Sequence, residues 1–218
     1  MAICDLVLPC RDEGPALADL LPRVPSEFDV VVVDNGSSDD TAEVARAHGA
    51  RVVAEPTPGY GAAVHAGLTA ARHDHVAVMD GDGSFDPDDL LPLLDDVVQG
   101  RADLAVGRRR PVQRGVWPWH ARAGNALVVA WLRRRIGMAP RDIAPMRVAR
   151  RADLLELDVR DRRFGYPVEL LQKATRAGWR VVEHDVAYHP RAEGTCSKVS
   201  GSVRGTVRTA RDFWRVLA

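Results

Sequence analysis

Short apolar runs alternate with longer segments of helical periodicity through the first half of the chain. The runs indicate strands because they are rich in β-branched residues and end at polar or turn-forming positions. They cover residues 3–8, 30–33, 51–54, 76–79 and 104–106. The segments between them predict helices at 15–21, 40–48, 61–71 and 87–99, the second opened by a capping box from Asp40 to Glu43. Since the strands lack polar alternation, we expect an α/β fold with a mostly parallel sheet flanked by helices.

The second half of the chain is less regular. A long helix is predicted at 117–136, with a break at Gly124, followed by a strand at 144–148 and a short helix at 152–157. A helix at 168–177, a strand at 180–185, a small, polar and basic loop at 191–205 and a last helix at 207–217 complete the pattern. No repeat or linker divides the chain, so we expect one domain with a helical, basic C-terminal part.

The zero net charge of the chain conceals a strong asymmetry. Residues 1–100 hold 19 acidic and 5 basic side chains, and residues 101–218 hold the other 11 acidic and 25 basic ones. We expect the acidic half to bind metal ions and the basic half to meet phosphates, another anion or an anionic membrane surface. Mutual neutralisation of the two halves across the fold is the alternative.

Three cysteines, Cys4, Cys10 and Cys196, show neither the even count of a disulfide framework nor a zinc-ligand spacing. This usage favours a reducing, cytoplasmic location. The N-terminus lacks the features of a signal peptide, and no apolar run approaches the ~18–20 residues of a membrane span. Any contact with a membrane is therefore expected to be peripheral.

Two carboxylates, Asp80 and Asp82, follow the strand predicted at 76–79. Residues two apart in an extended chain point to the same side, so both can converge on one point beyond the strand end. Mg²⁺ or Mn²⁺ takes such oxygens and shares its other positions with water and substrate phosphates. The spacing predicts a metal–diphosphate site at the carboxyl edge of the sheet, where ligands bind in open α/β sheets.

A second motif begins at Asp34, which leaves the strand at 30–33 and is followed by Asn35-Gly-Ser-Ser. It suits recognition of a nucleoside's base or ribose hydroxyls, and turn formation and capping are the alternative. With the two motifs together, the chain resembles family 2 glycosyltransferases of GT-A (Rossmann-like) fold, nearest the dolichyl- or polyprenyl-phosphate sugar synthases. Segments 8–13, 58–63, 103–109, 164–171 and 194–198 extend the resemblance.

The resemblance implies a single catalytic domain, 1–218, in which residues 1–110 bind the nucleotide sugar and residues 111–218 bind the acceptor. It assigns Asp80 and Asp82 to the metal, with Asp82 as the main ligand. Asn35 replaces a frequent second Asp, which removes one negative charge. The nucleotide-sugar site that the resemblance implies comprises Pro9, Arg11, Asp12, Glu13, Asp34, Asn35, Gly59, Tyr60, Gly61, Asp80, Gly81 and Asp82.

Displacement at an anomeric carbon needs a general base only if the acceptor is a hydroxyl, because a lipid phosphate is already anionic. Two carboxylates are candidate bases. Asp142 matches an acidic position of the family before the acceptor-side strand, and Glu169 lies at the start of the helix at 168–177. An ion pair with Arg141 or Arg147 is the alternative for Asp142. A favourable charge near a helix N-terminus is the alternative for Glu169.

Arginines and tryptophans interleave along the helix at 117–136 and the segment before it. Such a helix suits the headgroup level of a membrane, with Arg available for phosphate. A solvated or dimer-facing helix with Trp in the core is the alternative. The basic loop predicts a lid over a diphosphate, with an ordinary exposed loop as its alternative. Acceptor or phosphate contacts are expected from Arg108, Arg122, Arg191, Ser197 and Lys198.

Other classes fit the sequence less well. A dehydrogenase would need G-x-G-x-x-G after the first strand, and a calcium loop would need Gly and Glu where Phe85 and Leu91 stand. A nucleotidyltransferase would need a Gly-rich basic loop that segment 9–14 does not provide. His189 remains a further candidate neighbour of the nucleotide or the metal.

We therefore expect an inverting hexosyltransferase that uses Mg²⁺ or Mn²⁺ to transfer a hexose from a UDP- or GDP-sugar to a polyprenyl phosphate at the membrane surface. Transfer to a soluble hydroxyl acceptor is the alternative reaction, and a non-catalytic membrane adaptor is the alternative class. No nucleic acid is expected as a partner, and formation of a homodimer is left open.

Overall fold

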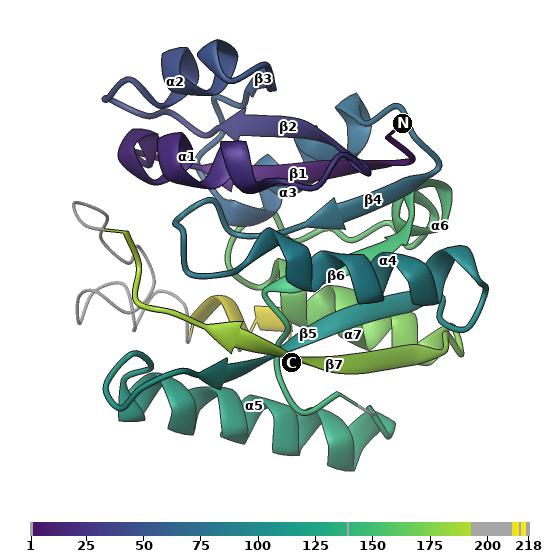
Figure 1. Cartoon of the computed structure of the whole chain (residues 1–218). Helices are drawn as coiled ribbons and strands as arrows, with labels where there is room; N and C mark the ends of the chain where they lie inside the picture. The colour runs from purple at the N-terminus through teal and green to yellow at the C-terminus, as the bar shows by residue number, and fades with distance from the viewer. Residues whose placement is uncertain (1, 139, 193–210, 214, 217–218) are drawn as a thin grey trace.

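The computed structural model describes residues 2–138, 140–192, 211–213 and 215–216, and Figure 1 shows their arrangement. The strands are β1 (Cys4–Cys10), β2 (Phe28–Asp34), β3 (Arg51–Ala54), β4 (His75–Val78), β5 (Leu104–Pro111), β6 (Met146–Arg150) and β7 (Val181–Tyr188). The helices are α1 (Gly14–Leu20), α2 (Thr41–Ala47), α3 (Tyr60–Ala70), α4 (Leu90–Val98), α5 (Trp119–Ile136), α6 (Arg151–Glu156) and α7 (Tyr166–Arg176), with short 3₁₀ turns at Leu21–Arg23 and Pro87–Asp89.

The strands form one sheet in the order β3-β2-β1-β4-β6-β5-β7. β6 pairs antiparallel with both β4 and β5, whereas the pairs β1–β2, β1–β4, β2–β3 and β5–β7 are parallel. The α/β fold with a mostly parallel sheet, predicted from the sequence, is confirmed. Because the parallel strands end at the same edge of the sheet, the loops that follow them meet there.

Helices cover both faces of the sheet, with α1 and α4 in front and α7 behind in Figure 1. Leu17 of α1 and Leu93 of α4 belong to the buried cluster on one face, and Leu68 of α3 and Leu171 of α7 belong to the cluster on the other. Full burial of such a side chain contributes roughly 1.5–3 kcal/mol. These two apolar layers hold the strands rigidly and so fix the edge where the polar loops meet.

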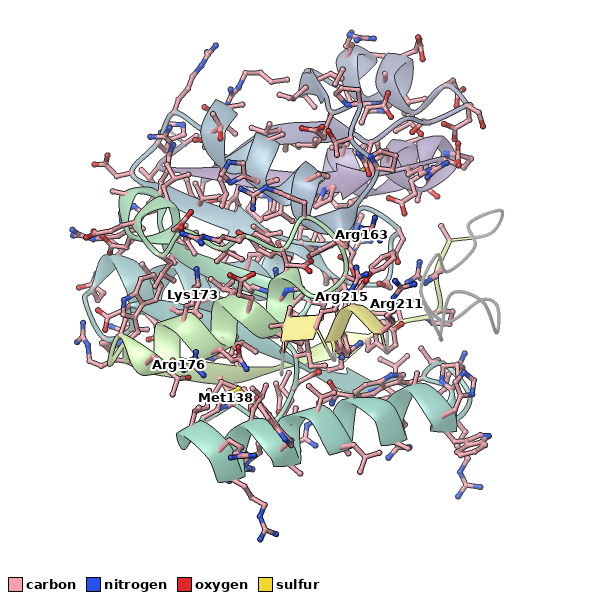
Figure 2. The ribbon with its side chains drawn as sticks, turned by 180° about the vertical axis from the view of Figure 1, so that it is seen from behind. Met138, Arg163, Lys173, Arg176, Arg211 and Arg215 are labelled. Atoms are coloured by element: carbon pink, nitrogen blue, oxygen red, sulfur yellow. The ribbon has the colours of Figure 1, made fainter. Side chains whose placement is uncertain are left out.

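The second half of the chain presents basic side chains at the rear of the molecule. Figure 2 shows Arg163, Lys173, Arg176, Arg211 and Arg215 on the side covered by α7 and the helical residues near the C-terminus. All of them except Lys173 are exposed. The charge asymmetry of the sequence is therefore not fully neutralised by contacts between the halves.

Two local predictions are wrong. The side chain of Asp40 makes no capping hydrogen bond at the start of α2. Instead, the carboxylate of Asp39 accepts hydrogen bonds from the amides of Gly14 and Thr41, at 3.1 Å each. The predicted helix break at Gly124 is absent as well, because α5 runs without interruption from Trp119 to Ile136.

Two strand boundaries shift in ways that matter for the site. β5 continues to Pro111 instead of ending at 106, so Arg108, Arg109 and Arg110 lie in a strand. β6 begins at Met146 instead of 144, because Ala144 adopts a left-handed conformation with φ 58°. The loop at 191–205 and the helix at 207–217 fall mostly outside the described residues. Within the described part of the chain, no helix combines the length and apolar content that crossing a membrane requires.

Candidate active site

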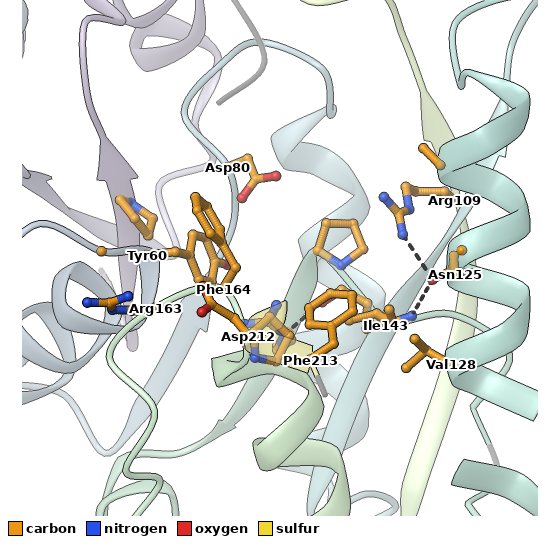
Figure 3. Close-up of a pocket in the computed structure, with 18 of the residues that line it drawn as sticks. Tyr60, Asp80, Arg109, Asn125, Val128, Ile143, Arg163, Phe164, Asp212 and Phe213 are labelled. Atoms are coloured by element: carbon orange, nitrogen blue, oxygen red, sulfur yellow. Dashed lines mark hydrogen bonds between the residues drawn. The ribbon is translucent and has the colours of Figure 1, made fainter. Parts of the chain in front are cut away.

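A cavity of about 1160 Å³ opens at the edge of the sheet where the parallel strands end. Cys10, Asn35 and Asp80 line it where β1, β2 and β4 end, and Arg109 of β5 and Arg147 of β6 also line it. In the close-up of Figure 3, Tyr60 and Asp80 lie across the cavity from Arg109. This is the position at which the sequence predicts a nucleotide ligand.

Seven of the predicted nucleotide-sugar residues line the cavity, and five do not. The lining ones are Pro9, Arg11, Glu13, Asn35, Gly59, Tyr60 and Asp80, and the others are Asp12, Asp34, Gly61, Gly81 and Asp82. Asp12 joins the loops that follow β1 and β2, whereas Asp34 closes the turn that follows its own strand. The amide of Ser38 donates to Asp12 Oδ1 at 2.8 Å, and the amide of Ser37 donates to Asp34 Oδ1 at 2.9 Å.

The side chain of Asn35 is fully engaged by the turn at 55–59. Its Nδ2 donates to the carbonyl oxygens of Glu55 and Thr57, at 2.9 and 2.8 Å, and its Oδ1 accepts from the amide of Gly59 at 2.8 Å. A carboxylate could supply neither of the two donated bonds. Asn35 therefore shapes the wall of the cavity through bonds that an Asp at this position could not donate.

The glycines of segment 59–61 allow close packing against the loop at 161–163. A Cβ on Gly59 or Gly61 would overlap the backbone of Arg162. The amides of Gly61 and Ala62 donate to the carbonyls of Arg163 and Arg162, at 3.1 and 2.9 Å. The second half of the chain thus caps the start of α3. Gly81 also stands where a side chain would not fit, because a Cβ there would overlap Sγ of Cys10.

Glu13 and Asp80, which line the polar end of the cavity, lie close to a third carboxylate, Asp82, which does not line it. Burial, with the nearby charges of Asp82 and Asp80, raises the pKa of Glu13 to about 8. Burial and Asp82 raise the pKa of Asp80 to about 6. Glu13 Oε2 is buried without a hydrogen-bond partner. The Asp82 side chain, 1% exposed, accepts from the amide of Ser84 and forms an ion pair with Arg191 Nη1 at 2.7 Å.

This cluster has the chemistry that a divalent cation requires. Its oxygens repel one another, and one of them lacks any partner, so a cation would lower the free energy of the site. Among the described residues, no three His, Cys, Asp or Glu side chains form a complete metal cage. Asp80 and Asp82 would therefore supply part of the ligand shell, and a diphosphate and water would supply the rest. The amide of His189 donates to the carbonyl of Ser84 at 2.9 Å, which places this residue beside the same turn.

Arg109 is a cavity residue that the sequence analysis did not single out. Its Nε and Nη2 donate to both oxygens of Asp142, at 2.9 and 2.6 Å, and its backbone amide also donates to Asp142, at 2.9 Å. Its guanidinium lies 4.1 Å from the ring centre of Trp117. Because side chains alternate along β5, its neighbours Arg108 and Arg110 lie outside the cavity and pair with Asp185.

Asp142 and Glu169 are both occupied by structural contacts, and neither is among the described residues that line the cavity. Burial alone would raise the pKa of Asp142, but the hydrogen bonds and charge of Arg109 outweigh it and hold the pKa low. Burial would likewise raise the pKa of Glu169, yet the amides of Arg160 and Asp161 donate to it and lower the pKa. The partner of Asp142 is thus Arg109, and not Arg141 or Arg147.

The predicted phosphate-binding residues divide in the same way. Arg191 lines the cavity, whereas Arg108 lies outside it and Arg122 is exposed on α5. Ser197 and Lys198 lie outside the described residues.

An apolar flank completes the cavity on the side of α5. Its residues are Leu127, Val128 and Trp131 of α5, with Ile143, Phe164 and Phe213 from other elements. Figure 3 shows Val128 and Ile143 facing Phe213 across this part of the cavity. The spacing 124, 127, 128 and 131 is that of one helix face, so the sequence carried this signal. The cavity therefore joins a carboxylate-rich end to an apolar end, with arginines between them.

Comparisons with known proteins agree with this geometry. The family model of glycosyl transferase family 2 matches residues 5–151. An uncharacterised glycosyltransferase of Mycobacterium tuberculosis is 55% identical over 214 residues, which cover 98% of this chain and 97% of that protein. The polyprenol monophosphomannose synthase of Mycolicibacterium smegmatis is 33% identical over 208 residues, 88% of this chain and 78% of that protein.

A further relative and a solved structure extend the comparison. The dolichyl-phosphate hexose transferase of Haloferax volcanii is 31% identical over 182 residues, 84% of this chain and 79% of that protein. The crystal structure of glucosyl-3-phosphoglycerate synthase from Mycobacterium tuberculosis with Mg²⁺ and UDP superposes with a TM-score of 0.79 at 23% identity, covering 99% of this chain and 78% of that one. The resemblance drawn from the sequence is confirmed, and this protein, a glycosyltransferase, belongs to glycosyl transferase family 2.

Proposed function

We propose that the protein transfers a hexose from a UDP- or GDP-sugar, held with Mg²⁺ or Mn²⁺, to a polyprenyl phosphate at the surface of a membrane. The observation that carries the proposal is the two-part cavity. Its polar end, with Glu13 and Asp80, suits a metal-bound diphosphate, and its apolar end, with Val128 and Trp131, suits an isoprenoid chain. A sugar between these ends would lie next to Arg109 and Arg147.

The donor would lie at the polar end. Asp80 and Asp82 would hold the metal, which, when bound, neutralises the charge that develops on the departing nucleoside diphosphate. Arg191 lies within ion-pair distance of Asp82 and lines the cavity, so it is placed to contact the same phosphates. Solved neighbours with this fold were crystallised with UDP and with Mn²⁺ or Mg²⁺, which supports this assignment.

A phosphate acceptor agrees with the state of the two predicted bases. Asp142 and Glu169 already accept several hydrogen bonds, and both have lowered pKa values, so neither is prepared to take a proton. A phosphate monoester is already anionic and needs no such base. Its attack on the anomeric carbon, in a single displacement opposite the leaving diphosphate, would invert the configuration. The names of two relatives, a polyprenol monophosphomannose synthase and a dolichyl-phosphate hexose transferase, support the same acceptor class.

Contact with the membrane would be peripheral and would involve α5. Trp119 and Leu127 are 80% and 73% exposed on this helix. Exposed Arg122, Arg133, Arg134 and Arg135 flank them on the same helix. Exposed apolar groups with neighbouring arginines suit the headgroup region of an anionic membrane. We place this contact on the cytoplasmic face.

Transfer to a hydroxyl acceptor is a second candidate, and one observation favours it. Asp212 lines the cavity, is 1% exposed, and its Oδ2 has no hydrogen-bond partner among the described residues. A carboxylate in this state could accept the proton of a hydroxyl acceptor.

The two candidates are separated by a transfer assay with mass-spectrometric detection. The protein is incubated with Mn²⁺ and UDP-glucose, UDP-galactose or GDP-mannose, and with polyprenyl phosphate in anionic vesicles or with phosphoglycerate in solution. We expect a hexosyl polyprenyl phosphate whose anomeric configuration, read by NMR, is inverted, and we expect Asp82→Ala to abolish it. Transfer to phosphoglycerate alone would select the second candidate, and absence of nucleotide binding would contradict both.

A further inference from the structure

Arg147 carries a buried charge that only the more distant carboxylate of Asp80 partly offsets. The residue is 3% exposed and lies in β6, paired with Val78 of β4. Its Nε donates to the carbonyl of Ala144 at 2.7 Å. Its Nη1 is buried without a hydrogen-bond partner, and no ion pair joins it to a described carboxylate. A buried hydrogen-bond donor that has no acceptor destabilises the folded protein by roughly 1–3 kcal/mol, and a buried charge without an ion-pair partner destabilises it more.

Tyr60, directly beside Arg147, also has a buried polar group that no described acceptor contacts. The guanidinium carbon of Arg147 lies 5.8 Å from the centre of the Tyr60 ring, a distance at which the ring face partly offsets the charge. The Tyr60 hydroxyl is also buried; it lies next to Arg147, but no described acceptor takes its proton. Both residues line the cavity. Two donors, Arg147 Nη1 and the Tyr60 hydroxyl, therefore meet with a positive charge at one place on its wall.

The position of Arg147 is fixed by a turn that also positions Arg109. Ala144, whose carbonyl holds Arg147, adopts a left-handed φ of 58°, which costs a non-glycine residue roughly 1–2 kcal/mol. The turn is held against this strain, because Asp142 binds Arg109 and the amide of Ile143 donates to Asn125 Oδ1 at 3.2 Å. Backbone strain maintained by surrounding contacts is characteristic of functional sites. Segment 142–144 thus presents two guanidinium groups to one cavity.

The ligand that would use these donors is an anion with several acceptor oxygens. A guanidinium N–H and a phenol O–H both donate, and a phosphate accepts such bonds in charge-assisted form. Arg147 lies on the strand next to β4, which leads directly into Asp80, so the phosphate would lie near the reacting sugar. We propose that Arg147 and Tyr60 form an anion site in the cavity wall that binds a phosphate group of a substrate. This deepens the proposed function, on which it depends for the identity of the phosphate, either that of the lipid acceptor or that of the nucleotide donor.

Arg147→Met and Tyr60→Phe test the site, because both keep much of the packing volume and remove the donors. Arg150→Met is the matched control, since Arg150 is an exposed arginine of the same strand. Inorganic phosphate is the first probe, and its effect is read as the increase in melting temperature of the metal-free protein. We expect phosphate to raise the melting temperatures of the wild type and of Arg150→Met. The increase should be smaller for Tyr60→Phe, and the melting temperature of Arg147→Met should not change.

The same measurement in phosphate-free buffer separates binding from a structural role. Arg147→Met removes a buried charge that has no ion-pair partner, but it also removes the favourable charge near Asp80, so we expect its melting temperature to stay close to that of the wild type. If Arg147→Met does not fold, Arg147→Gln, which also removes the charge, and Tyr60→Phe decide. Unchanged stabilisation by phosphate in both of these variants would overturn the inference.

Two further measurements identify the source of the phosphate. Calorimetric titration of UDP with Mn²⁺ reports on the donor, and the KM for polyprenyl phosphate in vesicles reports on the acceptor. Either UDP binding at least about tenfold weaker or a KM at least about tenfold higher, seen only in Arg147→Met and Tyr60→Phe, supports the site and identifies its phosphate. Wild-type values for both would overturn it. Wild-type protein that binds phosphate through Arg147 but transfers no hexose would contradict the proposed function and leave the anion site standing.

Discussion

Substitution of Asp142 by Asn decides whether this carboxylate acts in chemistry or in positioning. The side chain is fully buried and accepts three hydrogen bonds from Arg109, at 2.6 to 2.9 Å. The amide introduced by Asp142→Asn would be neutral and would turn an N–H₂ group toward those donors, which leaves the Arg109 charge unpaired. Breaking a buried ion pair from one side costs about 3–5 kcal/mol. With an m-value of about 2.5–3 kcal/mol/M, we expect the urea midpoint to fall by roughly 1–2 M.

The kinetic effect of Asp142→Asn should follow from the displaced Arg109 and not from a lost base. We expect the KM for the proposed acceptor, polyprenyl phosphate, to rise about tenfold while kcat falls less than about threefold. A general base would behave differently, because its removal lowers kcat by about 10²–10⁴. A fall of that size with an unchanged urea midpoint would refute the positioning role and restore Asp142 as the base.

Two controls make this result specific to the buried pair. Asp185→Asn removes an exposed partner of Arg110, whose ion pair measures 2.8 Å, and it should cost less than about 1 kcal/mol. Arg109→Met combined with Asp142→Asn should be less destabilised than the sum of the single variants, because each single variant leaves a buried partner unsatisfied. Strict additivity would mean that the two side chains do not stabilise each other in solution.

Three further results are expected. Asn35→Asp loses both bonds to the carbonyls of the 55–59 turn and should destabilise the protein by about 2–4 kcal/mol and weaken UDP binding; wild-type urea unfolding would contradict the role given to this amide. Gly61→Ala places a Cβ against the backbone at 161–162 and should cost about 1–3 kcal/mol, measured by urea unfolding, whereas Gly49→Ala, with open space around it, tests the strain of its positive φ without any overlap. Glu13 has a pKa raised to about 8 against an ordinary value near 4.5, so the folded state binds more protons and the metal-free protein should lose stability as pH rises from about 4.5 to 8. Melting temperatures measured across this pH range should fall as pH rises, and Mn²⁺ should make the fall smaller. If Glu13→Gln shows the same dependence of melting temperature on pH, another group is responsible.

The sequence predicted the sheet well, and it placed Glu13 and Asp80 at the edge where the cavity opens, because both features depend on local patterns. Buried strands show continuous apolar runs, and Asp80 and Asp82 directly follow one of them. The roles of Asp142 and Arg109 could not be read in this way. Their contact joins residues far apart in the chain, and it depends on β5 continuing through three arginines that look like a loop by composition. The left-handed Ala144 and the unpaired Arg147 carry no sequence signal at all, since Ala is not a residue that favours this conformation.

The antiparallel strand β6 also has a consequence for the order in which the sheet can fold. β6 lies between β4 and β5, so β5 has no hydrogen-bonded neighbour from the first half of the chain, and its two partners are both made later. During synthesis, both edges of β5 therefore remain unpaired until β6 has been synthesised and pairs β5 with the rest of the sheet. We therefore expect the two halves to fold together, with many contacts between residues far apart in the chain. A fragment that ends after β5 would expose an unprotected strand edge prone to association with other chains.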